Sequence, residues 1–148
     1  MSDSSRSAER ARSLEELEGV ELGPPSVDSY LVHTIHRLHK KPIGEFTVED
    51  LRIMIGQGRG LPFLVPLALD SLDLDPFAEG DFYEGDLLKA VLSVGTSFWL
   101  AHRTELQRVS QIATRSLSEL DALDTTDEIR NDLRSAGERT LKLGAAAV

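Results

Sequence analysis

The sequence predicts an all-α protein, a single compact helical domain of about five to seven helices. Apolar residues recur at helical spacing along most of the chain, and no short segment alternates strictly between apolar and polar residues as a half-buried strand would. Serine, threonine and acidic residues precede several of these apolar stretches at positions that favour helix N-termini. A length of 148 residues is typical of one domain.

The N-terminal segment differs in composition from the rest of the chain. Residues 1–12 are rich in Ser, Arg and Glu and contain almost nothing to bury, so we expect a disordered N-terminal tail there and a single helical domain over residues 13–148. Ser13 and Glu16 have the spacing of a capping box, in which the two side chains satisfy backbone amides at a helix start. This pair predicts a brief helix that ends at Gly19.

The next two helices are predicted from a cap followed by helical periodicity. Ser26 is the expected cap of a helix that continues to about Lys40. Thr47 and Asp50 form a second capping box in front of a largely apolar helix. The glycine-rich sequence GQGRG at residues 56–60 then ends that helix and permits a tight turn into the next one.

Four further elements complete the expected helical domain. Residues 62–75 are apolar on nearly every side, which suits a central helix, although the run FLVPLAL within them also fits a buried strand by periodicity alone. Residues 77–86 mix glycine, acids and aromatics and predict a structured loop before a short buried helix over residues 86–94. Residues 96–123 predict one long amphipathic helix, broken once near Ser116 or Ser118. Asp124, Thr125 and Thr126 supply a cap for a final helix that continues to residue 143.

Composition excludes several classes of function. The chain has no cysteine, which removes disulfides, thiolate metal sites and cysteine nucleophiles. No apolar run approaches the ~20 residues that span a bilayer, and the polar start is unlike a signal peptide. We therefore expect a cytoplasmic protein that does not insert into membranes. The net charge of −9 argues against direct nucleic-acid binding, since that requires clustered Lys and Arg, and favours a basic protein partner.

The acidic charge is concentrated in one window. Seven acids and no Lys or Arg lie between residues 70 and 86: Asp70, Asp73, Asp75, Glu79, Asp81, Glu84 and Asp86. Three aromatic residues are interleaved with them: Phe77, Phe82 and Tyr83. This mixture is typical of a docking surface, where aromatic side chains supply buried contact and carboxylates meet Lys and Arg of a partner. Turn bonds, a helix cap and ordinary solvated acids explain the same residues equally well.

Motifs for catalysis are weak or missing. His33, His36 and His39 have three-residue spacing on a predicted helix, so two of the imidazoles could hold a divalent metal with acids from the loop. A metal-dependent enzyme or metal-binding regulator built on His33 and His36 is therefore the alternative hypothesis. The glycines at 56–60 lack both the P-loop and the dinucleotide-binding pattern, and no serine lies in a GxSxG motif. We predict no catalytic residue, no metal ligand, no cofactor and no enzymatic activity.

Two segments resemble a known family. The sequence EDLRIMIGQGRGLPFLVPLAL at residues 49–69 and the sequence GDFYEGDLL at residues 80–88 resemble the core of immunity proteins from bacterial contact-dependent growth inhibition (CDI) systems. The similarity is strongest over residues 40–94 and extends more weakly over residues 30–99. The resemblance implies a small cytoplasmic antidote that binds the toxin domain delivered by a neighbouring cell. Such toxins are commonly nucleases.

The resemblance also divides the acidic residues. Immunity proteins discriminate between toxins, so residues in the shared motif are expected to form the loop and its cap, which applies to Asp81, Gly85 and Asp86. The acids that are not needed for the loop or its cap are freer to face a partner. The predicted partner-binding residues are Asp70, Asp73, Glu79, Tyr83 and Glu84. The expected partner is the basic C-terminal domain of the cognate toxin, bound 1:1.

Overall fold

Residues 3–147 are described by the computed structural model, and they form α-helices and 3₁₀ helices without a strand. The elements are α1 (Asp3–Arg10), α2 (Leu14–Glu18), α3 (Tyr30–His39), η1 (Ile43–Glu45), α4 (Val48–Gly56), α5 (Leu61–Leu74), α6 (Asp86–Leu92), α7 (Thr96–Ala101), α8 (Arg103–Glu119), η2 (Leu120–Ala122) and α9 (Asp127–Ala146). The predicted all-α class is confirmed. None of the helices in this part of the chain is long and apolar enough to cross a lipid bilayer.

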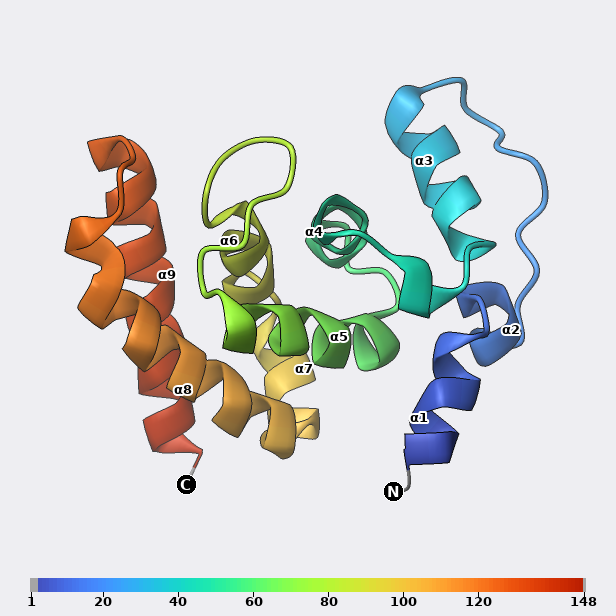
Figure 1. Cartoon of the computed structure of the whole chain (residues 1–148). Helices are drawn as coiled ribbons and strands as arrows, with labels where there is room; N and C mark the ends of the chain where they lie inside the picture. Colours follow the sequence, from blue (N-terminus) through green and yellow to red (C-terminus); the bar gives the residue numbers. More distant parts are fainter. Residues whose placement is uncertain (1–2, 148) are drawn as a thin grey trace.

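Helix α5 lies at the centre of the fold, as its sequence predicts. Leu64, Val65, Ala68, Leu69 and Leu72 of this helix are all completely buried. Helices α4, α6 and α8 pack around it, and Figure 1 shows α5 crossing the lower middle of the molecule. An element surrounded in this way needs apolar residues on several faces, which explains the nearly continuous apolar run. The alternative of a buried strand at FLVPLAL is wrong.

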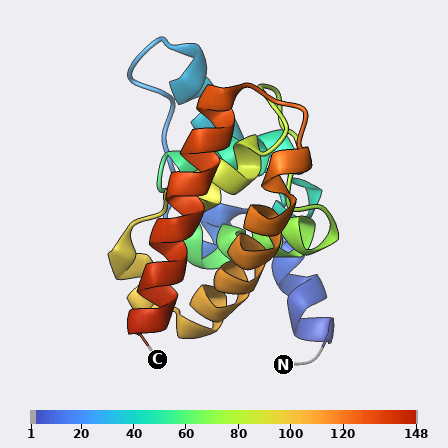
Figure 2. The same cartoon turned by 90° about the vertical axis from the view of Figure 1, so that its left-hand side faces the viewer.

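Helices α8 and α9 form one side of the molecule. They lie next to each other along most of their length and face the viewer in Figure 2. Helix α6 packs between α4 and α9 and so connects this pair to the rest of the core. The loop of residues 75–85, which carries most of the acidic window, leads into α6 and arches above this helix in Figure 1, between α9 and α4. The helices therefore hold the loop from two sides.

The N-terminal segment contains a helix in the structure. Residues 1–12 were expected to be disordered, whereas α1 occupies most of this segment; the expectation for residues 1–2 lies outside the described part of the chain. Two tertiary contacts hold the segment in place. Arg10 forms an ion pair with Asp70 of α5 at 3.0 Å, and the carbonyl of Arg12 accepts a hydrogen bond from the η1 backbone. Such long-range partners are invisible in a local composition count.

Two helix boundaries also differ from the prediction. Ser29 caps α3 instead of Ser26, since its side chain accepts the backbone N–H of Val32 at 3.1 Å. The long helix expected over residues 96–123 is broken at His102 instead of near Ser116 or Ser118. The backbone at His102 has φ −131° and ψ 68°, and the segment divides there into α7 and α8. This break and the presence of α1 account for nine helices in residues 3–147 where five to seven were expected.

Candidate functional site

The structure separates the five predicted partner-binding residues into two groups. Asp70 and Asp73 lie on α5, where they face α1 and α8. Glu79, Tyr83 and Glu84 lie on the loop of residues 75–85, here called the acidic loop. The sequence window therefore does not form one continuous patch, and the two groups have different electrostatic surroundings.

The α5 acids are paired within the chain. Asp70 accepts hydrogen bonds from Arg10 at 3.0 Å and from Arg108 at 2.9 Å, and Asp73 accepts from Arg108 at 2.7 Å. Burial lowers the pKa of Arg108, but the hydrogen bonds to Asp73 and Asp70 outweigh this effect and raise the pKa above its ordinary value. The carboxylates of this group are thus largely compensated, and they brace α5 against α1 and α8.

Asp86 fixes the acidic loop from inside. Its side chain is buried, and its carboxylate accepts the backbone N–H groups of Gly80 at 2.6 Å, Phe82 at 3.0 Å and Tyr83 at 3.4 Å. Gly85 precedes the helix with a φ of 96°, a left-handed conformation that disfavours residues with a Cβ. The expectation that Asp86 and Gly85 serve the loop is confirmed, but Asp86 does not cap the helix: Gly85 is the N-cap residue of α6, and no side-chain hydrogen bond caps that end.

A pair on α4 supports the same loop and was missed by the sequence analysis. Glu49 accepts the backbone N–H of Asp81 at 2.9 Å and binds Arg52 through two hydrogen bonds of 2.6 Å. The hydrogen bonds from Arg52 are the main reason why the pKa of Glu49 is lowered. The two residues are three positions apart on a predicted helix, which is a signal for an ion pair. Nothing local to that helix indicates that the loop is their second partner.

The outer surface of the acidic loop is left exposed. Glu79 and Glu84 form an isolated antiparallel bridge through their backbones while their side chains remain exposed. None of the ion pairs formed within residues 3–147 includes Glu79, Asp81 or Glu84. Tyr83 is half-buried, and burial together with nearby carboxylates raises its pKa. The loop therefore presents uncompensated negative charge on an ordered backbone.

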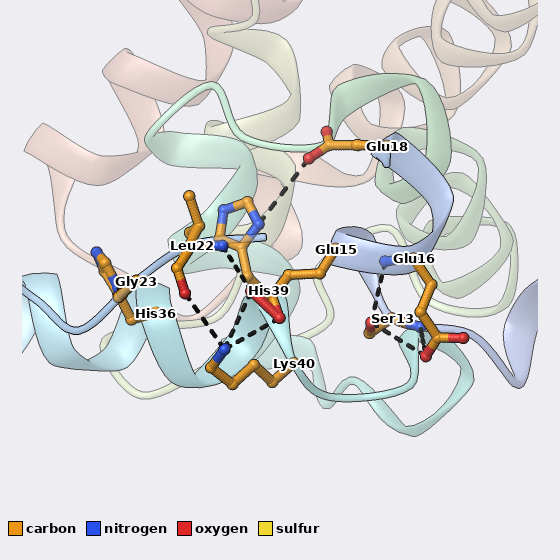
Figure 3. Close-up of polar contacts among 9 residues, drawn as sticks. All are labelled: Ser13, Glu15, Glu16, Glu18, Leu22, Gly23, His36, His39 and Lys40. Carbon is orange, nitrogen blue, oxygen red and sulfur yellow. Dashed lines mark hydrogen bonds and ion pairs between the residues drawn. The ribbon is translucent and has the colours of Figure 1, made fainter. Parts of the chain in front are cut away.

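The predicted histidine cluster is engaged in contacts within the chain. His33 lies 3.1 Å from Asp28, and His36 lies 2.9 Å from the carbonyl oxygen of Gly23. His39 is buried and points toward Glu18, while His36 lies apart from it (Figure 3). Within residues 3–147, no three histidines or acids are grouped as a metal site would require. The metal-dependent alternative therefore gains no support from the geometry.

His39 lies in the junction between α2 and α3. Its Nδ1 is 3.9 Å from a carboxylate oxygen of Glu18, and its Nε2 is buried without a hydrogen-bond partner. Lys40 beside it binds both carboxylate oxygens of Glu15 at 3.0 Å and also the carbonyl of Leu22 (Figure 3). Burial is the largest influence on the imidazole and lowers the pKa of His39, although the Glu18 carboxylate opposes this effect.

The lowered pKa predicts a pH-dependent stability. Because the pKa of His39 in the folded state is below the 6.5 of an unperturbed imidazole, the unfolded chain binds the proton first as the pH falls. Stability is therefore complete above about pH 7 and declines below it, by at most ~1.4 kcal/mol per pH unit, until the folded-state pKa is passed. We expect His39→Leu to reduce this decline in urea unfolding between pH 8 and pH 5. His33→Gln on the exposed side of α3 is the control. An equal decline in both variants would contradict the assignment of the pH-dependent loss of stability to His39.

The fold and the surface together define a class of protein. Residues 3–147 build a helical domain whose ordered acidic loop is suited to binding another protein. The matched family agrees with this: a family model described as CDI immunity proteins matches residues 16–109, and the chain belongs to that family. No curated protein matches significantly. The resemblance noted in the two sequence segments is thereby confirmed.

Membership in this family defines the general function. CDI immunity proteins neutralise the toxin of their own system by binding it, and they are typically not enzymes. The prediction that the chain lacks an enzymatic activity agrees with this. The matched region contains α3 to α7, the acidic loop and the Glu49 pair, whereas α9 lies beyond it.

Proposed function

We propose that the chain acts in the cytoplasm as the antidote to one CDI toxin, whose basic C-terminal domain it binds 1:1. The toxin domain is proposed to be a nuclease, because a nuclease presents Lys and Arg to its substrate phosphates and so attracts an acidic antidote. The observation that carries the proposal is the acidic loop, which exposes carboxylates and the Phe82 ring and whose backbone amides are held by hydrogen bonds to Asp86 and Glu49. The whole of residues 13–148 is proposed to form one immunity domain.

The two groups of acids have different proposed roles. Glu79, Tyr83 and Glu84 are proposed to contact the toxin, because the charge of both glutamates is free of ion pairs within residues 3–147. Asp70 and Asp73, also expected at the interface from the sequence, are already paired with Arg10 and Arg108. They are proposed to stabilise the packing of α5 and to contribute less to the toxin contact.

Copurification tests the proposed function. The C-terminal domain encoded by the reading frame next to this gene is coexpressed with the tagged chain, and a C-terminal toxin domain from an unrelated CDI system is the control. We expect a 1:1 complex with the neighbouring domain only, loss of its toxicity, and an association rate that falls as salt is added. Absence of binding to the neighbouring domain would refute the proposed function.

Two matched charge reversals test the assignment of the contact residues. Glu79→Lys with Glu84→Lys and Asp70→Lys with Asp73→Lys change the net charge equally, so they weaken long-range attraction to the same extent. We expect the loop pair to weaken toxin binding by ~2 kcal/mol, about 30-fold in Kd, and the α5 pair to weaken it by under ~1 kcal/mol. Calorimetric titration of both variants, after melting curves confirm folding, measures the difference. A larger loss in the α5 pair would assign the contact to α5.

A further inference from the structure

Phe82 is the exposed aromatic side chain on the acidic loop. The exposed fraction of this side chain is 69%, although a large apolar residue such as phenylalanine is ordinarily part of the hydrophobic core. The other large apolar side chains exposed within residues 3–147 are Val20, Val27, Tyr30, Leu31, Leu74 and Leu100. Three further observations distinguish Phe82 from them: its fixed backbone, its neighbouring cation and the groove beside it.

The ring of Phe82 is held in an outward position. Its own backbone N–H is bound by the buried Asp86, so the loop cannot withdraw the residue without breaking that hydrogen bond. The guanidinium of Arg52 lies over the ring, 4.4 Å from its centroid, and is itself fixed by Glu49. One face of the ring therefore rests on a cation that is held in place, which reduces the conformational entropy lost when the other face is covered.

A groove runs beside this ring between α4, the acidic loop and α6. It has a volume of about 440 Å³, and its walls include Arg52, Gln57, Phe82, Tyr83, Lys89 and Ser93. These residues lie on or at the ends of α4 and α6 and on the acidic loop, so the walls come from three separate segments of the chain. The two aromatic rings supply apolar contact, and the polar side chains are spread around them. Such a mixture is typical of a pocket for one anchoring side chain.

We propose that Phe82 is the apolar anchor of the toxin interface, and that the groove beside it receives an aliphatic side chain of the basic toxin domain. This inference rests on the proposed function, since it commits to the toxin as the occupant. Charge complementarity supports that occupant: Glu79, Asp81 and Glu84 are exposed on the same loop and have no ion-pair partner within residues 3–147. Lys or Arg residues flanking the inserted side chain would reach these carboxylates while Phe82 is buried.

Single alanine substitutions at three exposed side chains test the proposal. Phe82→Ala removes the anchor, Leu74→Ala removes an 87% exposed side chain just before the loop, and Tyr30→Ala removes an 83% exposed aromatic on α3. The probe is the C-terminal domain encoded by the reading frame next to this gene, titrated calorimetrically. We expect Phe82→Ala to raise Kd at least ~10-fold with an unchanged melting temperature, and both controls to stay within ~2-fold of the unsubstituted protein.

Hydrogen exchange gives a readout that needs no substitution. We expect toxin binding to slow amide exchange at residues 80–86 and along the groove walls on α4 and α6, and to leave the start of α3 unchanged. A wild-type Kd for Phe82→Ala, or a loss confined to Tyr30→Ala, would overturn the proposal while the toxin complex itself remains established. If the unsubstituted protein does not bind the toxin domain, the proposed function fails and this inference fails with it.

Discussion

Replacing Asp86 with alanine is expected to lower the free energy of unfolding by ~3 kcal/mol. The carboxylate is buried, and it is the acceptor for the backbone N–H groups of Gly80, Phe82 and Tyr83. Each hydrogen bond to a charged acceptor is worth ~1.5–3 kcal/mol, and buried donors left without an acceptor add a desolvation cost. Part of this loss is recovered because the loop relaxes and its amides reach water. Urea unfolding followed by circular dichroism measures the change.

Two control variants separate the role of Asp86 from loop acidity in general. Asp81→Ala removes an exposed carboxylate from the same loop and should change stability by no more than ~0.5 kcal/mol. Asp86→Asn keeps the shape and one carbonyl acceptor, so its effect should fall between the other two. Toxin affinity should fall in the Asp86 variants as well, because a loosened loop no longer holds Phe82 in place. Equal urea midpoints for Asp86→Ala and the unsubstituted protein would contradict the role of Asp86 in fixing the loop.

Local signals in the sequence predicted much of the fold. The capping boxes at Ser13 and Thr47 and the cap at Thr126 are all present, because a cap depends on residues only three positions apart. The central position of α5 followed from its apolar composition. The cap of α3 was misplaced because Ser26 and Ser29 are both suitable in composition, and only the path of the chain decides between them.

Long-range contacts limited the prediction of the candidate site. Asp70 is bound by Arg10, 60 residues earlier, and by Arg108, 38 residues later, so its lack of free charge could not be inferred from the window around it. The contact between Glu49 and the N–H of Asp81 spans 32 residues. The sequence correctly predicted an acidic loop that involves Asp86, but this aspartate binds the amides of the loop instead of capping α6. Which acids remain unpaired is a property of the packed helices.

Replacing Trp99 with alanine should have the largest effect on stability, about 4 kcal/mol. Its exposed fraction is 2%, its indole N–H donates to the carbonyl of Val94 at 3.2 Å, and the Phe98 ring meets it edge-on with centroids 5.2 Å apart. Truncation leaves a cavity in the core and an unpaired carbonyl beside it. Because the chain has one tryptophan, the unfolding of this variant is followed by circular dichroism instead of fluorescence.

Packing next to Trp99 also explains why the helix breaks at His102, a position that the sequence does not indicate. Propensity favours a continuous helix through His102. Its imidazole, however, stacks on the Phe98 ring with centroids 4.1 Å apart, its Nδ1 lies 2.9 Å from the Phe98 carbonyl oxygen, and its backbone N–H donates to the Trp99 carbonyl. These contacts at the end of α7 outweigh local preference. Trp99→Phe fills part of the cavity and should cost about half as much. Leu100→Ala, at a side chain that is 42% exposed, should cost under ~1 kcal/mol. If Leu100→Ala and Trp99→Ala destabilise the protein equally, the claim that burial of the indole stabilises the end of α7 is contradicted.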